Sequence, residues 1–307
     1  MSGQLVPEGP DPRSIVAPVV PRMKKRRLGR WGNPIGIVGA VIVAFMILVA
    51  LVGQYVWTID PDAQNYDRLL SPNWTNPMGT DELGRDIMAR IIHGARVSLQ
   101  VGFISVGIAM VFGTTLGLIA GYYKGVTDGL LMRIVDIMFS IPGLVLAILI
   151  AGLLGPSRRN AMIAIGIIII PVFARVIRGA VLEVMGYPYI ESARALGAPG
   201  SRIMRQHVLP NVVAPLIVLV TVYLSVAILA EAALSFLGLG TQPPEASWGS
   251  MLSTSRSYLD FAPWYSIFPG AAIAVVVLGF NFLGDGLRDI LDPRLGAVVG
   301  TLPIEKK

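Results

Sequence analysis

The stretch that decides the fold is an unbroken apolar run at residues 35–56, IGIVGAVIVAFMILVALVGQYV. It contains no charged residue. About 20 such residues, wound as a helix, cross the roughly 30 Å hydrocarbon core of a bilayer. The run therefore predicts a membrane-spanning helix.

Five further apolar runs follow along the chain, and each is long enough to be read in the same way. The composition agrees, because 54% of the 307 residues are hydrophobic and 14% are charged, whereas soluble domains carry about 25% charged residues. The sequence thus predicts an all-α integral membrane protein with six transmembrane helices. The five further spans are expected at residues 97–120, 134–154, 161–176, 212–234 and 265–283.

The distribution of basic residues predicts the orientation of these spans. Lys and Arg are retained on the cytoplasmic side of a membrane. With both termini inside, 18 of the 25 Lys and Arg residues lie in inner segments and seven in outer ones. Inverting the spans would reverse this bias, so we expect an N-in, C-in arrangement.

The domain organisation follows from the spans. Residues 1–33 form a Pro-rich polar segment, expected to be a disordered cytoplasmic tail. Its cluster Lys24–Lys25–Arg26–Arg27 is interpreted as a topology anchor that touches membrane lipid, and not as a nucleic-acid arm. Residues 34–96 hold the first span and an external segment. Residues 97–290 form a five-span core with a cytoplasmic loop at about 180–210, and 291–307 are a cytoplasmic tail.

The residue inventory excludes several kinds of chemistry. There is no cysteine, and His93 and His207 are the only histidines, so thiolate and multi-histidine metal centres are excluded. No G-x-x-x-x-G-K-[ST] phosphate loop and no G-x-S-x-G elbow occur. We therefore expect no metal, no cofactor and no catalytic residue in this chain. A membrane-embedded hydrolase is disfavoured, and so is an ion-coupled secondary transporter, which should show several acids in mid-span.

Two acidic residues within the spans need partners or water, because an ionised group is costly in hydrocarbon. Asp136 lies three residues after Arg133, which predicts a local ion pair. Glu231 lies near the outer end of the fifth span. Two roles are left open for it. It could pair with Arg85, Arg90 or Arg96 and hold an outer gate shut, or it could face the transport pathway.

Glycine and proline predict how the spans pack. Gly113, Gly117 and Gly121 recur at four-residue spacing, and small residues on one helix face let another helix approach closely. Pro142 and Pro171 are expected to kink the third and fourth spans.

The predicted cytoplasmic loop carries a distinctive pattern, YIESARALGAPG at residues 189–200 and HVLPN at 207–211. The first part predicts a short helix that stops at Gly197, with Glu191 in its first turn, where a carboxylate suits the helix dipole. A second short helix should end before Pro210. Small side chains along the first helix would let a partner surface approach closely.

This loop resembles the EAA loop of ABC importer permeases. Glu191, Gly197, Leu209 and Pro210 match at the family's spacing, while Ser192 stands where alanine is usual. The resemblance implies that the loop contacts a partner ATPase. The residues expected to form this coupling site are Glu191, Ser192, Ala193, Gly197, Gly200, Leu209 and Pro210.

Three other stretches, at residues 76–99, 234–249 and 280–295, resemble the C-type subunit of the dipeptide/oligopeptide/nickel permease family. In the first of them, Thr80 is expected to cap a short helix that begins at Asp81. Arg85 and Arg96 are candidates for the gate or pathway, together with Glu231. The candidate residues of the external segment are Gly79, Thr80, Asp81, Gly84, Arg85 and Asp86.

The family resemblance implies a type I ABC importer permease that pairs with a homologous second permease. Two ATP-binding subunits, which hold ATP and Mg, and an external substrate-binding protein would complete the importer. The mechanism would be alternating access driven by ATP hydrolysis in those partners, with no covalent step in this chain. Di- or oligopeptides are the expected cargo, and nickel or another small solute remains an alternative.

Overall fold

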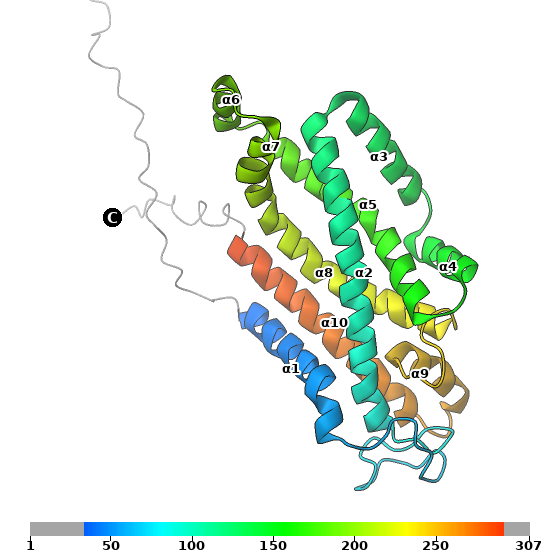
Figure 1. The fold of residues 1–307 in the computed structure, drawn as a ribbon. Helices are drawn as coiled ribbons and strands as arrows, with labels where there is room; N and C mark the ends of the chain where they lie inside the picture. Colours follow the sequence, from blue (N-terminus) through cyan, green and yellow to red (C-terminus); the bar gives the residue numbers. More distant parts are fainter. Residues whose placement is uncertain (1–33, 292–307) are drawn as a thin grey trace, which may run out of the picture. The chain divides into compact units, whose positions relative to one another are not determined.

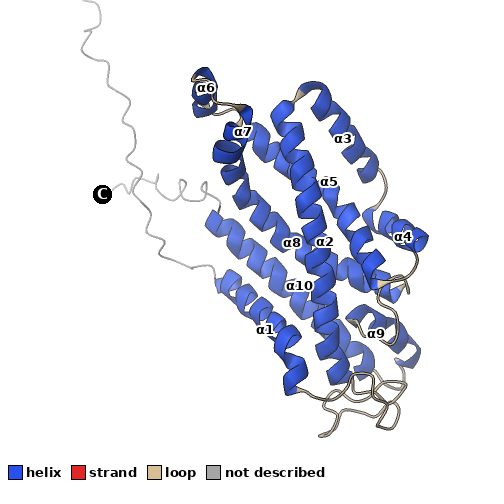
Figure 2. Ribbon diagram, in the orientation of Figure 1, coloured by secondary structure: helices blue, strands red, loops and turns tan. Residues whose placement is uncertain are grey.

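The computed structural model of the chain describes residues 34–291 (Figure 1). All regular elements of this part are helices, and a single isolated bridge joins Thr80 to Asp86 (Figure 2). The longer elements are α1 (Pro34–Val56), α2 (Ile87–Tyr123), α3 (Gly125–Phe139), α4 (Gly143–Leu154), α5 (Arg158–Val184), α8 (Leu209–Phe236) and α10 (Trp264–Leu291), and the shorter are α6 (Pro188–Ala195), α7 (Gly200–Ile203), η2 (Met204–Val208), α9 (Trp248–Ser255) and η3 (Arg256–Tyr258).

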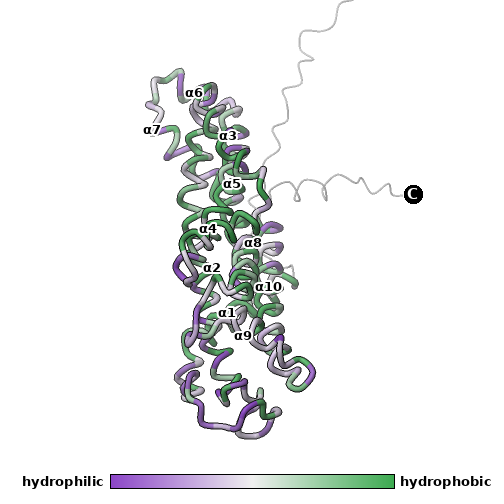
Figure 3. The backbone as a smooth tube through the Cα atoms, turned by 90° about the vertical axis from the view of Figure 1, so that its right-hand side faces the viewer, coloured by the Kyte–Doolittle hydropathy of each residue, from purple (hydrophilic) through white to green (hydrophobic). Residues whose placement is uncertain are grey.

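Five helices of the described chain are long and apolar enough to cross a membrane, and α3 with α4 makes a sixth span if the bent pair is counted as one. The prediction of an all-α, six-span fold is thereby confirmed. Figure 3 shows the apolar middle of the bundle between more polar segments, with the 57–86 segment at one end and α6 and α7 at the other. The predicted tail at 1–33, and the one at 291–307 apart from Leu291, lie outside the described residues, and so does the N-in, C-in arrangement of the termini.

The third span was predicted as one kinked helix, but it consists of two separate helices. α3 ends at Phe139, α4 begins at Gly143, and the two helices meet at 88°. Pro142 is the N-cap residue of α4. Because proline disfavours helical geometry in the residue before it and has no N–H to donate, the chain breaks here. Pro171, by contrast, lies inside α5, which runs unbroken from Arg158 to Val184.

The second span begins ten residues earlier than predicted, at Ile87. At 1.5 Å per residue its 37 residues extend about 55 Å, so α2 is much longer than the hydrocarbon core is thick. The prediction placed this first part, which contains the polar residues Arg90, His93 and Arg96, in the external segment. It is helical because Asp86 caps it, accepting the Ala89 N–H at 2.7 Å.

Close packing of α2 against α5 confirms the prediction made from the glycine spacing. A Cβ on Gly113 would lie 2.5 Å from the Phe173 Cβ, and one on Gly117 would lie 2.6 Å from the Ala174 carbonyl oxygen. Gly121 meets Val181 in the same way, at 2.8 Å. Any larger side chain at these three positions would push the two helices apart.

A second close crossing joins α1 to α10, and no pattern in the sequence predicted it. A Cβ on Gly36 would lie 2.7 Å from the Gly286 Cα, and one on Gly279 would lie 2.6 Å from Ile42. The glycines that permit this approach lie about 250 residues apart in sequence, so only the folded chain brings them together.

Candidate functional site

The predicted coupling helix is α6. Its only buried residue is Ile190, and its last turn is closed by Gly197, whose φ is +79°. The Gly197 N–H donates to the Arg194 carbonyl (2.9 Å), and the Ala198 N–H donates to the Ala193 carbonyl (3.0 Å). This pair of bonds is the Schellman arrangement, in which the residue after the helix adopts the left-handed conformation. The predicted stop at Gly197 is confirmed.

The prediction that the second short helix of the loop ends before Pro210 is wrong. α7 passes into the π-turn η2 and then directly into α8, so residues 200–236 are helical without a break. Pro210 lies in the first turn of α8, and the Leu209 N–H bonds to the Met204 carbonyl. The wider π-turn lets the helix continue past the proline. Such turns within helices frequently occur at functional sites.

Apolar side chains attach the loop to the bundle. Ile190 of α6, Ile203 of α7 and Val208 of η2 are all at most 1% exposed. They pack in one cluster with Ile177 and Val181 of α5. Gly200 adds a close approach, since a Cβ there would lie 2.5 Å from the Tyr122 hydroxyl of α2. The loop therefore rests on the ends of α2, α5 and α8 (Figure 1).

The opposite surface of the loop is exposed. Glu191, Ser192, Gly197, Leu209 and Pro210 are all exposed, whereas Ala193 and Gly200 are half-buried. Leu196, at the tip, is an apolar side chain with 88% exposure. A protruding helix with an apolar tip beside a carboxylate is suited to lie in a partner's groove.

The segment predicted to be external, residues 57–86, is organised around Asp81, which is fully buried. Its carboxylate accepts the backbone N–H groups of Leu83 and Arg85 (both 2.9 Å) and the Arg85 Nε at 2.6 Å. The Arg90 Nε lies 3.5 Å from the same carboxylate. Asp86 caps α2 and also accepts from Trp57 Nε1 (3.1 Å) and Asn76 Nδ2 (2.7 Å).

The prediction that Thr80 caps a helix at Asp81 is wrong, because no helix begins there. Its hydroxyl donates to the Asp67 carbonyl (2.7 Å) and accepts the Leu70 N–H (2.8 Å), so it ties two parts of the segment together. Gly79 and Gly84 have φ values of +78° and +77°, which explains why glycine stands at both turns.

The predicted pairing of Glu231 with an arginine is also wrong. Glu231 is 1% exposed, and its carboxylate accepts from Ser98 of α2 (3.0 Å) and Ser235 of α8 (2.7 Å). The Ser247 hydroxyl, at the N-cap of α9, is a third group beside it. The candidate arginines are placed elsewhere, because Arg85 and Arg90 bind the acids of the external segment and Arg96 is exposed on α2.

The predicted ion pair between Asp136 and Arg133 is wrong as well. It binds Arg175 of α5 at 2.6 Å and not its sequence neighbour Arg133. Asp128 binds Arg178 of α5 through both carboxylate oxygens, at 2.5 and 2.6 Å. These two pairs fix α3 to α5. Sequence reasoning missed them because their members lie 39 and 50 residues apart, beyond the reach of any helical spacing rule.

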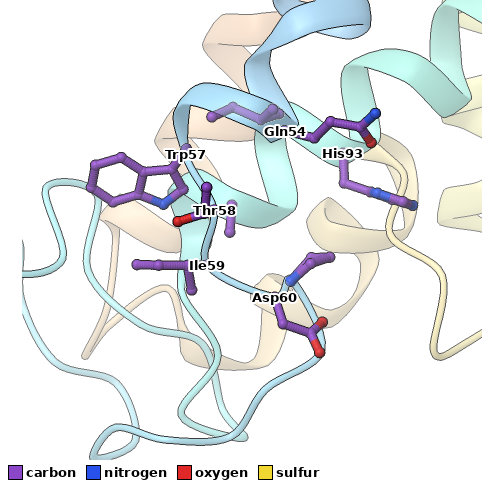
Figure 4. Close-up of a pocket in the computed structure, with 9 residues that line it drawn as sticks. Gln54, Trp57, Thr58, Ile59, Asp60 and His93 are labelled. Atoms are coloured by element: carbon purple, nitrogen blue, oxygen red, sulfur yellow. The ribbon is translucent and has the colours of Figure 1, made fainter.

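A small pocket of about 200 Å³ lies where α1, the segment after it and the start of α2 meet (Figure 4). Gln54, Trp57, Asp60 and His93 are among its lining residues. Across residues 34–291 no group of three His, Cys, Asp or Glu residues is arranged to hold a metal ion.

Comparison with known proteins gives two family matches. Residues 113–297 match the family described as "Binding-protein-dependent transport system inner membrane component". Residues 31–72 match the "N-terminal TM domain of oligopeptide transport permease C".

Individual relatives are similar over most of their length. The dipeptide transport system permease protein DppC of Alkalihalophilus pseudofirmus is 46% identical, over 94% of this chain and 95% of the relative. The glutathione transport system permease protein GsiD of Pectobacterium atrosepticum is 44% identical, over 85% and 87%. Among solved structures, the MetNI methionine ABC transporter in an inward-facing conformation matches with a TM-score of 0.57 and 21% identity, over 67% of this chain and 98% of that one. This last match bears on the fold alone.

Proposed function

Because the chain belongs to the family of binding-protein-dependent transport system inner membrane components, the permeases of ABC importers, we propose that it forms half of a peptide-conducting pathway. It is a multi-pass protein of the inner membrane. The cargo is a di- or oligopeptide. The names of the relatives, which include dipeptide, D,D-dipeptide, di/tripeptide and glutathione permeases, support peptides over nickel.

The observation that carries the proposal is the geometry of α6. It is fixed to α5 and α8 through Ile190 and its apolar neighbours, and it exposes Glu191, Ser192 and Leu196. Such a helix can receive a push from a partner and pass it to the spans. ATP and Mg bind in two partner ATPases, and this chain transmits their motion without making or breaking a covalent bond.

The remaining partners follow the same logic. A homologous second permease completes the pathway, and an external binding protein delivers the peptide to the side of the 57–86 segment. In the resting state the buried cluster around Glu231 keeps that side closed. ATP-driven closure of the ATPases moves α6, and the spans then alternate their access.

The test is uptake by the complete importer in proteoliposomes, with ATP enclosed. Uptake of radiolabelled dialanine should require the binding protein and ATP, and a protonophore should leave it unchanged. Uptake that continues without the ATPases but collapses with the protonophore would show an ion-coupled transporter instead. Uptake of nickel, without any uptake of dipeptide, would select the alternative cargo.

A further inference from the structure

A cleft of about 820 Å³ opens between α5, α8 and α10, beside the coupling loop. On α8 its lining includes Val218, Leu219 and Val222, so the cleft follows one face of this helix away from the loop. The same face stays open beyond the cleft, because Val226 and Leu229 are 42% and 56% exposed. α8 therefore has an open face along most of its length.

Two polar side chains flank this open face near the middle of the span. Tyr223 is half-buried on α8, and its ring packs edge-on against Phe173 of α5, with 5.8 Å between the ring centroids. Asn281 of α10 accepts the Ser225 hydroxyl at 2.9 Å. Successive residues of a helix are about 100° apart, so Val226 lies about 60° from Tyr223 on one side and about 100° from Ser225 on the other. The open face thus has Tyr223 at its α5 edge and Asn281 at its α10 edge.

Both side chains have a hydrogen-bond donor to spare. Within residues 34–291 the Tyr223 hydroxyl and the Asn281 Nδ2 have no hydrogen-bond partner, and neither atom is sealed from the surface. Tyr223 lies about 20 Å from either end of α8 (Leu209–Phe236) at 1.5 Å per residue, which places it inside a hydrocarbon core of about 30 Å. Asn281 is level with it, because it bonds to the second residue after Tyr223. Hydrocarbon offers no partner to such donors, so this face opens on water or on a polar ligand and not on lipid.

We propose that Tyr223 and Asn281 line the transport pathway at mid-span and donate hydrogen bonds to the backbone carbonyl groups of the passing peptide. The proposal rests on the peptide-import function proposed above. Every di- or oligopeptide has a peptide-bond carbonyl whatever its side chains are, so two donors of this kind suit a carrier of many peptides. Hydrogen bonds between neutral groups are weaker than those to charged groups, so they guide the peptide without preventing its release.

The cleft continues this surface from mid-span to the coupling loop. A peptide that passes Tyr223 next meets the apolar side chains of Val176 and Val218 in the cleft. Its volume of about 820 Å³ lies within the range of about 300–1,000 Å³ that is typical of small-molecule sites, so a dipeptide fits. Tyr187, the N-cap residue of α6, also lines the cleft. The inner exit of the pathway therefore lies beside the coupling helix.

Cysteine accessibility in the complete importer tests whether the open face of α8 meets water. Val226→Cys lies on this face between the two donors, and Phe45→Cys, at a position 59% exposed in the middle of α1, is the control. In nanodiscs, with the binding protein and ATP, a charged methanethiosulfonate should modify Val226→Cys and leave Phe45→Cys unmodified, because the reactive thiolate forms in water. Equal modification at both positions, or none at Val226→Cys, would overturn the proposal.

Removing the donors tests their part in transport. Tyr223→Phe keeps the ring on Phe173 and loses only the hydroxyl, so the dialanine transported per ATP hydrolysed should fall by about threefold or more. Asn281→Ala should act in the same direction. Tyr55→Phe is the matched control, since it removes an exposed hydroxyl from α1, and its ratio should equal that of the wild type. A purely structural hydroxyl would lower uptake and ATPase activity together, and an unchanged ratio in Tyr223→Phe would refute the proposal.

The peptide carbonyl is tested with dialanine whose peptide-bond oxygen is replaced by sulfur, a weaker acceptor. The wild type should transport dialanine faster than the sulfur analogue, and Tyr223→Phe should reduce this preference. The binding protein is the same in both assays, so the change in preference belongs to the permease. An unchanged preference would refute recognition of the carbonyl and leave the import function standing. No dialanine uptake by the wild-type importer would refute both.

Discussion

The two ends of the bundle are held together by different physics. At the loop end, α6 and α7 are attached by apolar side chains, Ile190, Ile203 and Val208, and their outer face is exposed. At the other end, buried polar groups do this work, with Asp81 and Arg85 in the external segment and Glu231 behind it. Apolar contacts tolerate sliding, whereas a buried carboxylate requires its donors in place. From this comparison we expect a coupling end that shifts readily and a rigid opposite end.

The largest effect is expected at the centre of the rigid end. Asp81→Ala leaves the buried Arg85 and Arg90 without their shared carboxylate, and breaking a buried pair costs about 3–5 kcal/mol. The purified complex should therefore melt at a clearly lower temperature. Asp62→Ala is the matched control, because Asp62 binds the same Arg90 with a side chain that is 43% exposed. Equal melting temperatures for the two variants would show that burial of Asp81 adds no stability to this end.

A smaller effect, directed at gating, is expected at Glu231. Glu231→Ala leaves the Ser98 and Ser235 hydroxyls without their acceptor, at a cost of about 1–3 kcal/mol for each group that stays unsatisfied. Because the Ser98 bond joins α2 to α8, the contact between these two helices should loosen, and ATPase activity without the binding protein should rise. Glu231→Gln keeps an acceptor oxygen, so its rise should be smaller.

The control for this experiment is Ser225→Ala. It also removes a hydroxyl from α8, but that hydroxyl donates to Asn281 and not to Glu231. Its ATPase activity should match the wild type. If basal and stimulated rates stay unchanged in both Glu231 variants, the carboxylate has no part in gating.

At the coupling end we expect a local effect with no loss of folding. Gly197→Asp places a side chain where φ is +79°, which costs about 1–2 kcal/mol, although nothing lies within 4 Å of the new Cβ. The turn after α6 should shift, and fewer ATPase subunits should co-purify with the permease. Ser201→Asp adds the same charge nearby, in an exposed helical position, and should co-purify normally. Wild-type ATPase yield and uptake with Gly197→Asp would argue against this role for the turn.

The last experiment is expected to leave stability and activity unchanged. It tests which end of the bundle lies outside the membrane. The chain has no cysteine, so single cysteines report accessibility. Glu82 is a poor position, since its side chain is 15% exposed and accepts the Tyr265 hydroxyl at 2.7 Å. Trp74 in the same segment is fully exposed. Trp74→Cys should react with an impermeant thiol reagent on intact spheroplasts, and Ser192→Cys only after lysis. The reverse pattern would invert the topology.

The sequence by itself determined the features that depend on local pattern. Apolar runs gave the spans, because a helix in hydrocarbon must be apolar along its whole length. The glycine after α6 was predictable because one residue type suits a left-handed turn, and Gly113, Gly117 and Gly121 were predictable because they repeat on one helix face. The spacing of Glu191 and Gly197 could be matched to the family because it is also a local pattern in the sequence.

Only the tertiary structure decided which charged group meets which partner. Glu231 looked as if it needed an arginine, but the fold brings Ser98 of α2 to it, and its second donor is Ser235, one turn further along α8 itself. Asp136 lies one helical turn from Arg133 yet binds Arg175 on another helix. A carboxylate is satisfied equally well by several donors, so its own sequence neighbourhood does not specify the partner. The path of the backbone makes that choice, and it also forms the cleft beside the coupling loop.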